Sequence, residues 1–133
     1  MRFISRVIAL SLVAGLGACA HDGPAYSEAP AGVAVVDMTS GLKYVPATVT
    51  IKSGQTVQWR NKAFMSHTVT DDPAAVKDAA HVALPAGAAA FDSGEIKPGA
   101  VWSHAFTTPG TYRYVCKPHE GTGMMATVVV TAG

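Results

Sequence analysis

The segment Tyr114-Val-Cys-Lys-Pro-His-Glu-Gly-Thr-Gly-Met124 decides the fold, because it places three metal-ligating residue types directly after a strand pattern. Cys116 offers a thiolate, His119 an imidazole and Met124 a thioether, all within nine residues. Two histidines, one cysteine and a weak methionine form an electron-transfer copper site, since soft sulfur ligands select copper. His67, far upstream, offers the second imidazole. The sequence therefore predicts one copper ion and a rigid scaffold that brings His67 to this loop. The alternative is a buried free cysteine beside an unrelated surface histidine.

The rest of the chain reads as an all-β protein. Short runs in which apolar and polar residues alternate, such as Val57 and Trp59 with their polar neighbours, are separated by turn residues such as Ser53-Gly54 and Pro109-Gly110. No repeat and no convincing long helix interrupts them, which favours a β-sandwich. We expect strands over residues 33–38, 49–52, 56–60, 67–70, 101–106, 111–116 and 125–131.

Residues 71–90 fit this pattern worst and are predicted to form a short helical or irregular excursion. A short helix over residues 74–82 would begin after Pro73 and end before Pro85. His81 lies within this excursion and is interpreted as a solvated loop residue, with a second metal or partner site as the alternative. His104 shares a strand face with Trp102 and is interpreted as a core or rim residue rather than a ligand.

The N-terminus is typical of an exported protein. Arg2 and Arg6 precede an apolar run over residues 7–16 that is too short to span a bilayer, as in a secretory signal. The run ends in Leu16-Gly-Ala-Cys19, which resembles the bacterial lipobox, so we predict lipidation of Cys19. Ala20 is not the aspartate that retains such proteins at the inner membrane, which favours the outer membrane in a Gram-negative organism. Ordinary cleavage that leaves Cys19 a free thiol is the alternative.

These features predict a signal peptide over residues 1–18, a lipidated terminus and flexible tether over residues 19–32, and one domain over residues 33–133. Residues 19–133 carry eight Lys and Arg side chains against nine Asp and Glu, with no run of like charges. This balance does not indicate nucleic-acid binding. With Cys19 acylated and Cys116 on the metal, no disulfide is predicted.

The spacing of Cys116, His119 and Met124 is that of plastocyanin and pseudoazurin, and the chain resembles the small blue-copper cupredoxins over residues 33–131. The matching segments are Val57-Gln-Trp-Arg-Asn61, Phe91-Asp-Ser-Gly94, Lys97-Pro-Gly99 and Thr108-Pro-Gly-Thr-Tyr-Arg-Tyr-Val-Cys116. The resemblance implies a Greek-key β-sandwich with one type 1 copper that cycles between Cu(II) and Cu(I). It also implies a monomeric electron carrier, not an enzyme. The predicted signal and lipidation place this carrier in the periplasm or at the cell surface. His119 would be the electron port, meeting redox partner proteins through a small transient interface.

Three positions test the resemblance in detail. Tyr112 stands where the family has a tyrosine corner, which ties strand to loop through the hydroxyl group. Ser66 replaces the proline often found before the first histidine ligand. Thr68 replaces the asparagine that follows this ligand in plastocyanins, which alters a hydrogen bond near the metal and so the reduction potential.

Two other functions use the same ligands. A copper storage or delivery protein would bind the metal without redox turnover, but such proteins usually carry Met- and His-rich segments, and here only Met124 and Met125 cluster. The chain could also be a docking domain of a larger oxidase or reductase. Reversible bleaching of a blue colour separates an electron carrier from a storage protein.

Overall fold

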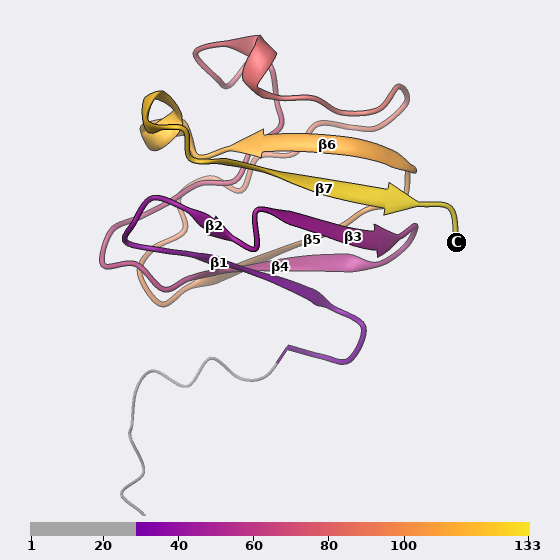
Figure 1. The fold of residues 1–133 in the computed structure, drawn as a ribbon, viewed down its shortest axis with the longest axis horizontal. Helices are drawn as coiled ribbons and strands as arrows, with labels where there is room; N and C mark the ends of the chain where they lie inside the picture. The colour runs from indigo at the N-terminus through magenta and orange to yellow at the C-terminus, as the bar shows by residue number, and fades with distance from the viewer. Residues whose placement is uncertain (1–28) are drawn as a thin grey trace, which may run out of the picture.

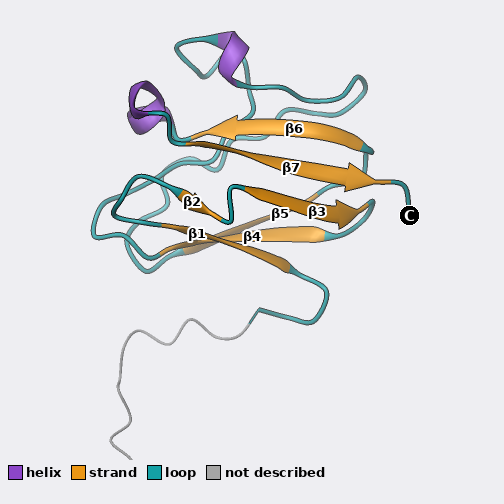
Figure 2. Ribbon diagram, in the orientation of Figure 1, coloured by secondary structure: helices purple, strands orange, loops and turns teal. Residues whose placement is uncertain are grey.

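The computed structural model describes residues 29–133, which form two β-sheets packed face to face (Figures 1 and 2). The strands are β1 (Ala34–Met38), β2 (Tyr44–Val45), β3 (Thr48–Lys52), β4 (Thr56–Asn61), β5 (Val101–Ala105), β6 (Gly110–Val115) and β7 (Met125–Thr131). Two 3₁₀ turns complete the described elements, η1 (Ala79–His81) and η2 (Lys117–Thr122).

The strand order is β2-β1-β4-β5 in one sheet and β3-β7-β6 in the other. The β1–β4 and β3–β7 pairs are parallel, whereas the other pairs are antiparallel. The chain therefore crosses between the sheets repeatedly, and the prediction of an all-β Greek-key sandwich is confirmed. In Figure 1 the loop that follows β6 lies at the opposite end of the sandwich from the C-terminus.

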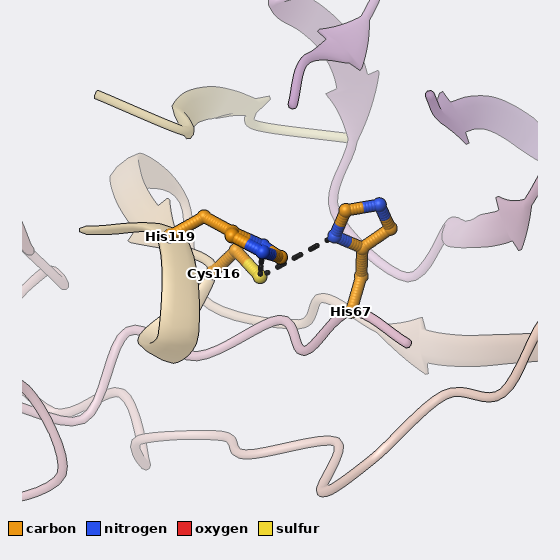
Figure 3. Close-up of side chains that lie close together, drawn as sticks. All are labelled: His67, Cys116 and His119. Atoms are coloured by element: carbon orange, nitrogen blue, oxygen red, sulfur yellow. Dashed lines mark hydrogen bonds between the residues drawn. The ribbon is translucent and has the colours of Figure 1, made fainter. Parts of the chain in front are cut away.

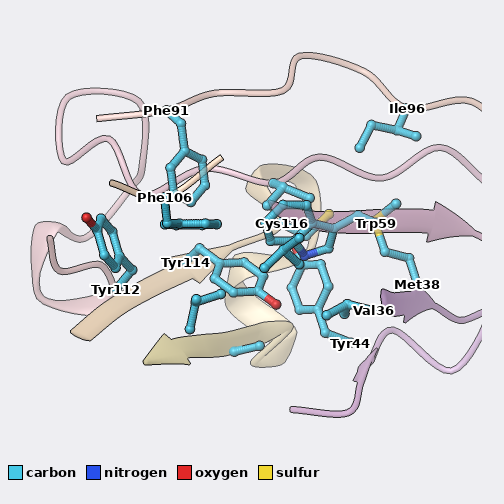
Figure 4. Close-up of a cluster of buried hydrophobic side chains, with 14 of the residues drawn as sticks. Val36, Met38, Tyr44, Trp59, Phe91, Ile96, Phe106, Tyr112, Tyr114 and Cys116 are labelled. Carbon is cyan, nitrogen blue, oxygen red and sulfur yellow. The ribbon is translucent and has the colours of Figure 1, made fainter. Parts of the chain in front are cut away.

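Aromatic rings fill the space between the sheets, with Trp59 at their centre (Figure 4). Trp59 is fully buried, as strand alternation with Val57 predicts. Its ring centroid lies 5.4 Å from that of Tyr114 and 5.3 Å from that of Trp102. Edge-to-face and tilted contacts of this kind stabilise a core beyond the area that they bury. The interior is thus a close-packed support for the loops at its ends.

Two tyrosine hydroxyl groups tie loops to this core. The Tyr112 hydroxyl donates to the carbonyl of Thr108 at 2.7 Å, which confirms the predicted tyrosine corner. The Tyr44 hydroxyl donates to the carbonyl of Thr68 at 2.6 Å. β2, which carries Tyr44, was not among the expected strands, because two residues are too few for a recognisable alternation.

The prediction of a strand over residues 67–70 is wrong. This segment forms only isolated bridges, from His67 to Ile96 and from Thr70 to Asp92 and Val115. Its backbone groups are thus shared among several partners rather than paired along one strand. The segment is nonetheless buried throughout.

The short helix expected over residues 74–82 is also wrong, since only the 3₁₀ turn η1 forms there. The N–H groups of Lys77 and Asp78 donate to the carboxylate of Glu120, at 2.9 and 3.0 Å, instead of to carbonyls one turn earlier. This contact with a distant side chain overrides the local helix propensity. The broader prediction of an irregular excursion over residues 71–90 is confirmed.

The predicted signal peptide over residues 1–18, the lipidation of Cys19 and most of the tether lie outside the described residues. Within residues 29–133, no helix has the length and apolar character needed to cross a membrane.

Candidate metal centre

Three of the predicted ligand side chains meet at one end of the sandwich (Figure 3). Cys116 directly follows β6, His119 lies in η2, and His67 comes from the long connection between β4 and β5. Both imidazoles turn Nδ1 toward the Sγ atom of Cys116, His119 at 3.3 Å and His67 at 3.6 Å. The three donor atoms lie within 4.8 Å of one another, close enough to share one metal ion.

The loop that carries Cys116, His119 and Met124 is closed by its own backbone. The Cys116 N–H donates to the Met124 carbonyl at 3.0 Å, and the Met124 N–H donates to the His119 carbonyl at 3.3 Å. The His119 N–H in turn donates to the Cys116 carbonyl at 3.1 Å. Met124 is fully buried, whereas Met125 is 37% exposed at the start of β7. The turn therefore directs only Met124 into the interior beside Cys116.

Asn61 holds the loop that positions His67, and sequence reasoning did not single it out for this role. Its side-chain amide is buried and donates to the carbonyls of Met65 and Ile96, both at 2.8 Å, while its Oδ1 accepts from the Ala63 N–H at 2.9 Å. His67 and Ile96 exchange backbone hydrogen bonds at 3.1 and 2.8 Å. The sequence did contain a signal for this role, since Asn61 is a polar residue at the inward-facing end of a strand. A buried amide must find hydrogen-bond partners there.

Thr68 contacts the sulfur atom of Cys116. Its N–H donates to Sγ at 3.4 Å and its hydroxyl lies 3.9 Å from Sγ, while Oγ1 accepts from the Lys117 N–H at 2.8 Å. Thr68 thus links the segment of His67 to the loop of Cys116. Hydrogen bonds to a ligating sulfur tune the reduction potential of copper sites. The departure from the plastocyanin asparagine therefore lies where it affects the metal.

The environment of Cys116 and His67 favours their neutral side chains before metal enters. Burial raises the pKa of the Cys116 thiol, and the hydrogen bonds from Thr68 offset part of this rise. Burial lowers the pKa of His67, with a further contribution from His119, while the Thr39 backbone raises it. A metal must therefore displace the thiol proton, as cysteine-ligated metals do. Two imidazoles, one thiolate and a buried thioether are a soft donor set that fits copper.

Glu120, immediately after His119, is 3% exposed and was not predicted to matter. Besides the N–H groups of Lys77 and Asp78, its carboxylate contacts Nδ1 of His81 at 2.9 Å. His81 lies in the excursion with a side chain that is 38% exposed, as expected of a solvated loop residue, but its ring also has a buried carboxylate as partner. The acidic residue beside a ligand was visible in the sequence, but its partners lie about forty residues away.

His104 behaves as expected. It is half-buried, its ring stacks on Trp102 with centroids 5.7 Å apart, and it packs against Phe91 and Phe106 at 4.7 and 4.8 Å. Burial lowers its pKa. The prediction that it is a core or rim residue is confirmed.

This donor set on a two-sheet sandwich defines a small blue-copper cupredoxin, and comparison with known proteins agrees. The family model described as copper binding proteins, plastocyanin/azurin family, matches residues 31–131. The chain therefore belongs to the plastocyanin/azurin family of copper-binding proteins. Copper is thus its cofactor, and the cluster fits one type 1 site.

Individual relatives support this assignment. The chain is 38% identical to Scenedesmus fuscus plastocyanin over 92 residues, 69% of this chain and 90% of that protein. It is 36% identical to a Synechococcus plastocyanin over 131 residues, 94% of this chain and 90% of that protein. It spans only 61% of the chloroplastic plastocyanin of Tetradesmus obliquus, at 38% identity over 69% of this chain. Among solved structures, an oxidized amicyanin variant aligns with a TM-score of 0.59 and 33% identity, over 78% of this chain and 87% of that one.

Proposed function

We propose that this protein is a type 1 copper electron carrier in which His67, Cys116, His119 and Met124 hold the metal. The observation that carries the proposal is the buried thiol of Cys116 with an imidazole Nδ1 at 3.3 Å and another at 3.6 Å. Copper bound by these residues accepts and releases one electron by cycling between Cu(II) and Cu(I). The protein carries electrons and is not an enzyme.

The residues around the donors keep them in place in both oxidation states. The backbone ring through Cys116, His119 and Met124 fixes one side of the site, and the amide of Asn61 fixes the segment of His67 on the other. A preorganised ligand set rearranges little when the copper ion gains or loses an electron, and this makes electron transfer fast.

His119 is the electron port in this proposal. It is the partly exposed member of the three clustered donors, since His67 and Cys116 are buried. Apolar side chains from the neighbouring loops support a docking surface for redox partner proteins, namely Pro118, which is exposed, Met65, which is half-buried, and Phe64, which is 78% exposed. A small apolar surface suits brief encounters of a monomer with its partners.

The location of the protein follows from its sequence and its class. Plastocyanin and amicyanin relatives support a site of action outside the cytoplasm. Removal of residues 1–18 and lipidation of Cys19 would place the domain of residues 33–133 on a bacterial membrane facing the periplasm or the cell surface. The sequence around Cys19 is what supports this finer assignment.

The test of the proposed function is the colour of the copper-loaded protein. We expect an intense blue protein that a mild reductant bleaches and an oxidant restores. Cys116→Ser should keep the β-sandwich, measured by circular dichroism, and lose both the colour and the redox cycle, because the thiolate is the charge-transfer partner. A Cys116→Ser variant that is blue and redox-active would contradict the ligand assignment. A wild-type protein that binds copper without reversible colour would instead be a storage or delivery protein.

A further inference from the structure

Glu120 is the buried residue of the turn η2, which also carries His119. Its carboxylate reaches the excursion, where it accepts hydrogen bonds from the N–H groups of Lys77 and Asp78 and contacts Nδ1 of His81. These contacts hold the pKa of the Glu120 carboxyl below its ordinary value, the Lys77 N–H being the largest cause. We call this set of four residues the latch. A buried carboxylate with charge-assisted hydrogen bonds is held more firmly than a neutral side chain would be.

The backbone beside Glu120 needs such support. His119 interrupts η2 with a non-helical conformation (φ −115°, ψ 16°), and Gly123 ends the turn in the left-handed region at φ 79°. The N–H of Gly123 is shared between the carbonyls of Glu120 and His119, while Gly121 and Thr122 are exposed. The backbone hydrogen bonds within this short, kinked turn join residues of its own loop, and Glu120 is its one buried side chain.

The other side of the latch is anchored to the sandwich. Ala83 and Arg113 of β6 exchange backbone hydrogen bonds at 3.1 and 2.9 Å, and the Arg113 guanidinium donates to the carbonyl of Ala80 at 2.9 Å. β6 leads directly into Cys116. The latch therefore connects the turn of His119 to the strand that positions Cys116, by a route separate from the loop backbone.

We propose that Glu120 is a positioning residue for the copper site, which fixes the turn of His119 against the excursion through the latch. The inference rests on the proposed role of His119 as a ligand. It assigns a task to the excursion of residues 71–90, which is to brace the ligand loop from outside. Outer partners that orient ligand residues typically change metal affinity by about 10- to 100-fold when they are removed.

Glu120→Gln and Asp72→Asn form a matched pair for the test. Each removes one negative charge, but Asp72 lies in the excursion outside the latch, and an amide there keeps the hydrogen bond that Oδ1 accepts from the Ala74 N–H at 2.9 Å. An amide at Glu120 turns an NH₂ group toward the N–H of Lys77 or Asp78 and breaks the latch. In the metal-free protein we expect amide hydrogen exchange of residues 117 and 119–123 to accelerate by about tenfold or more in Glu120→Gln, because opening the turn no longer breaks hydrogen bonds to a charged group. Copper transfer from the loaded protein to a chelator should accelerate by a similar factor, and Asp72→Asn should change neither rate.

Several results would overturn the inference. Exchange and copper-release rates in Glu120→Gln equal to those of the wild type would do so. Accelerated exchange spread equally over β4 and β7, or the same change in Asp72→Asn, would do so as well. If Glu120→Gln does not fold, His81→Ala removes one contact and keeps the two N–H groups, and it must accelerate exchange of the same residues by a smaller factor. Exchange is measured without metal, and the colour of the wild type tests the proposed function, so the two failures are distinguishable.

Discussion

Among single residues, Asp71 is the buried acid with the least support. It is fully buried, and its Oδ1 accepts from the Phe91 N–H at 2.7 Å, whereas its Oδ2 has no partner among residues 29–133. Burial raises the pKa of this carboxyl to about 6, and the nearby Asp72 adds to the effect, while the Phe91 N–H opposes it. Desolvation thus outweighs the hydrogen bond. The carboxyl group is neutral in the folded protein at a pH where it is ionised in the unfolded chain.

Asp71 should therefore make the metal-free domain less stable as the pH rises from about 4 to about 6. In this window the unfolded chain, with a pKa near 3.8, has released the proton that the folded protein still holds, so the free energy of unfolding falls with pH and levels off above the folded pKa. A tenfold difference in proton affinity between the two states corresponds to about 1.4 kcal/mol, so the loss is about 2–3 kcal/mol at most. Asp71→Asn keeps an acceptor for Phe91 and should remove this slope.

Urea unfolding of both proteins between pH 4 and pH 7 checks this prediction. Other titrating groups, such as the metal-free ligands, are common to the two proteins and cancel in the difference. Parallel curves for the wild type and Asp71→Asn would show that Asp71 does not titrate in this window.

At the scale of elements, the excursion of residues 71–90 covers the edge of the sheet at β6. Thr70 bridges to Val115 and Ala83 to Arg113, so the edge strand meets backbone partners on its outer side. Exposed strand edges invite pairing with other chains, and a covering segment prevents this. Pro85 of the excursion packs against Gly110, where a Cβ atom would stand 2.6 Å from Cβ of Pro85.

Gly110→Ala should consequently cost more stability than an alanine at another glycine with positive φ. Gly94→Ala is the matched control, because Gly94 has φ 64° and nothing within 4 Å of the place that a Cβ atom would take, whereas Gly110 combines φ 140° with the contact to Pro85. Positive φ alone costs about 1–2 kcal/mol. Overpacking should add about 1–3 kcal/mol in Gly110→Ala. The denaturant midpoints of the two variants give the difference in their stability. Equal midpoints would mean that Pro85 moves away from the new Cβ atom without cost.

At the scale of the whole molecule, the sandwich presents the copper loop at one end, while the predicted attachment to a membrane lies in a segment outside the described residues (Figure 1). A lipidated Cys19 with a tether to residue 32 would let the domain reach partners without fixing its orientation. Diacylglycerol supplies two acyl chains, and two chains are enough for stable anchoring.

Cell fractionation tests this attachment. We expect the wild-type protein in the membrane fraction and Cys19→Ser in the soluble fraction outside the cytoplasm. Cys116→Ser is the control, because it removes the other cysteine and should stay with the membrane. A wild-type protein that is already soluble contradicts the lipobox interpretation.

The sequence by itself determined six of the seven strands described in residues 29–133 and the candidate donor residues, because both are written in short local patterns. Alternation marks strands such as β4 and β7 over a few residues, and Cys116, His119 and Met124 lie in one loop, where covalent spacing limits how far apart they can be. His67 was found by its residue type, and the fold brings its Nδ1 to 3.6 Å from the sulfur atom of Cys116.

Only the tertiary structure decided what surrounds these donors. The latch of Glu120, the hydroxyl of Thr68 near the sulfur atom and the irregular course of residues 74–82 all depend on hydrogen bonds between residues about forty or more positions apart. A backbone N–H donates to the acceptor that the tertiary structure places within reach. Where this acceptor is a buried carboxylate instead of the carbonyl one turn earlier, local helix propensity no longer predicts the structure.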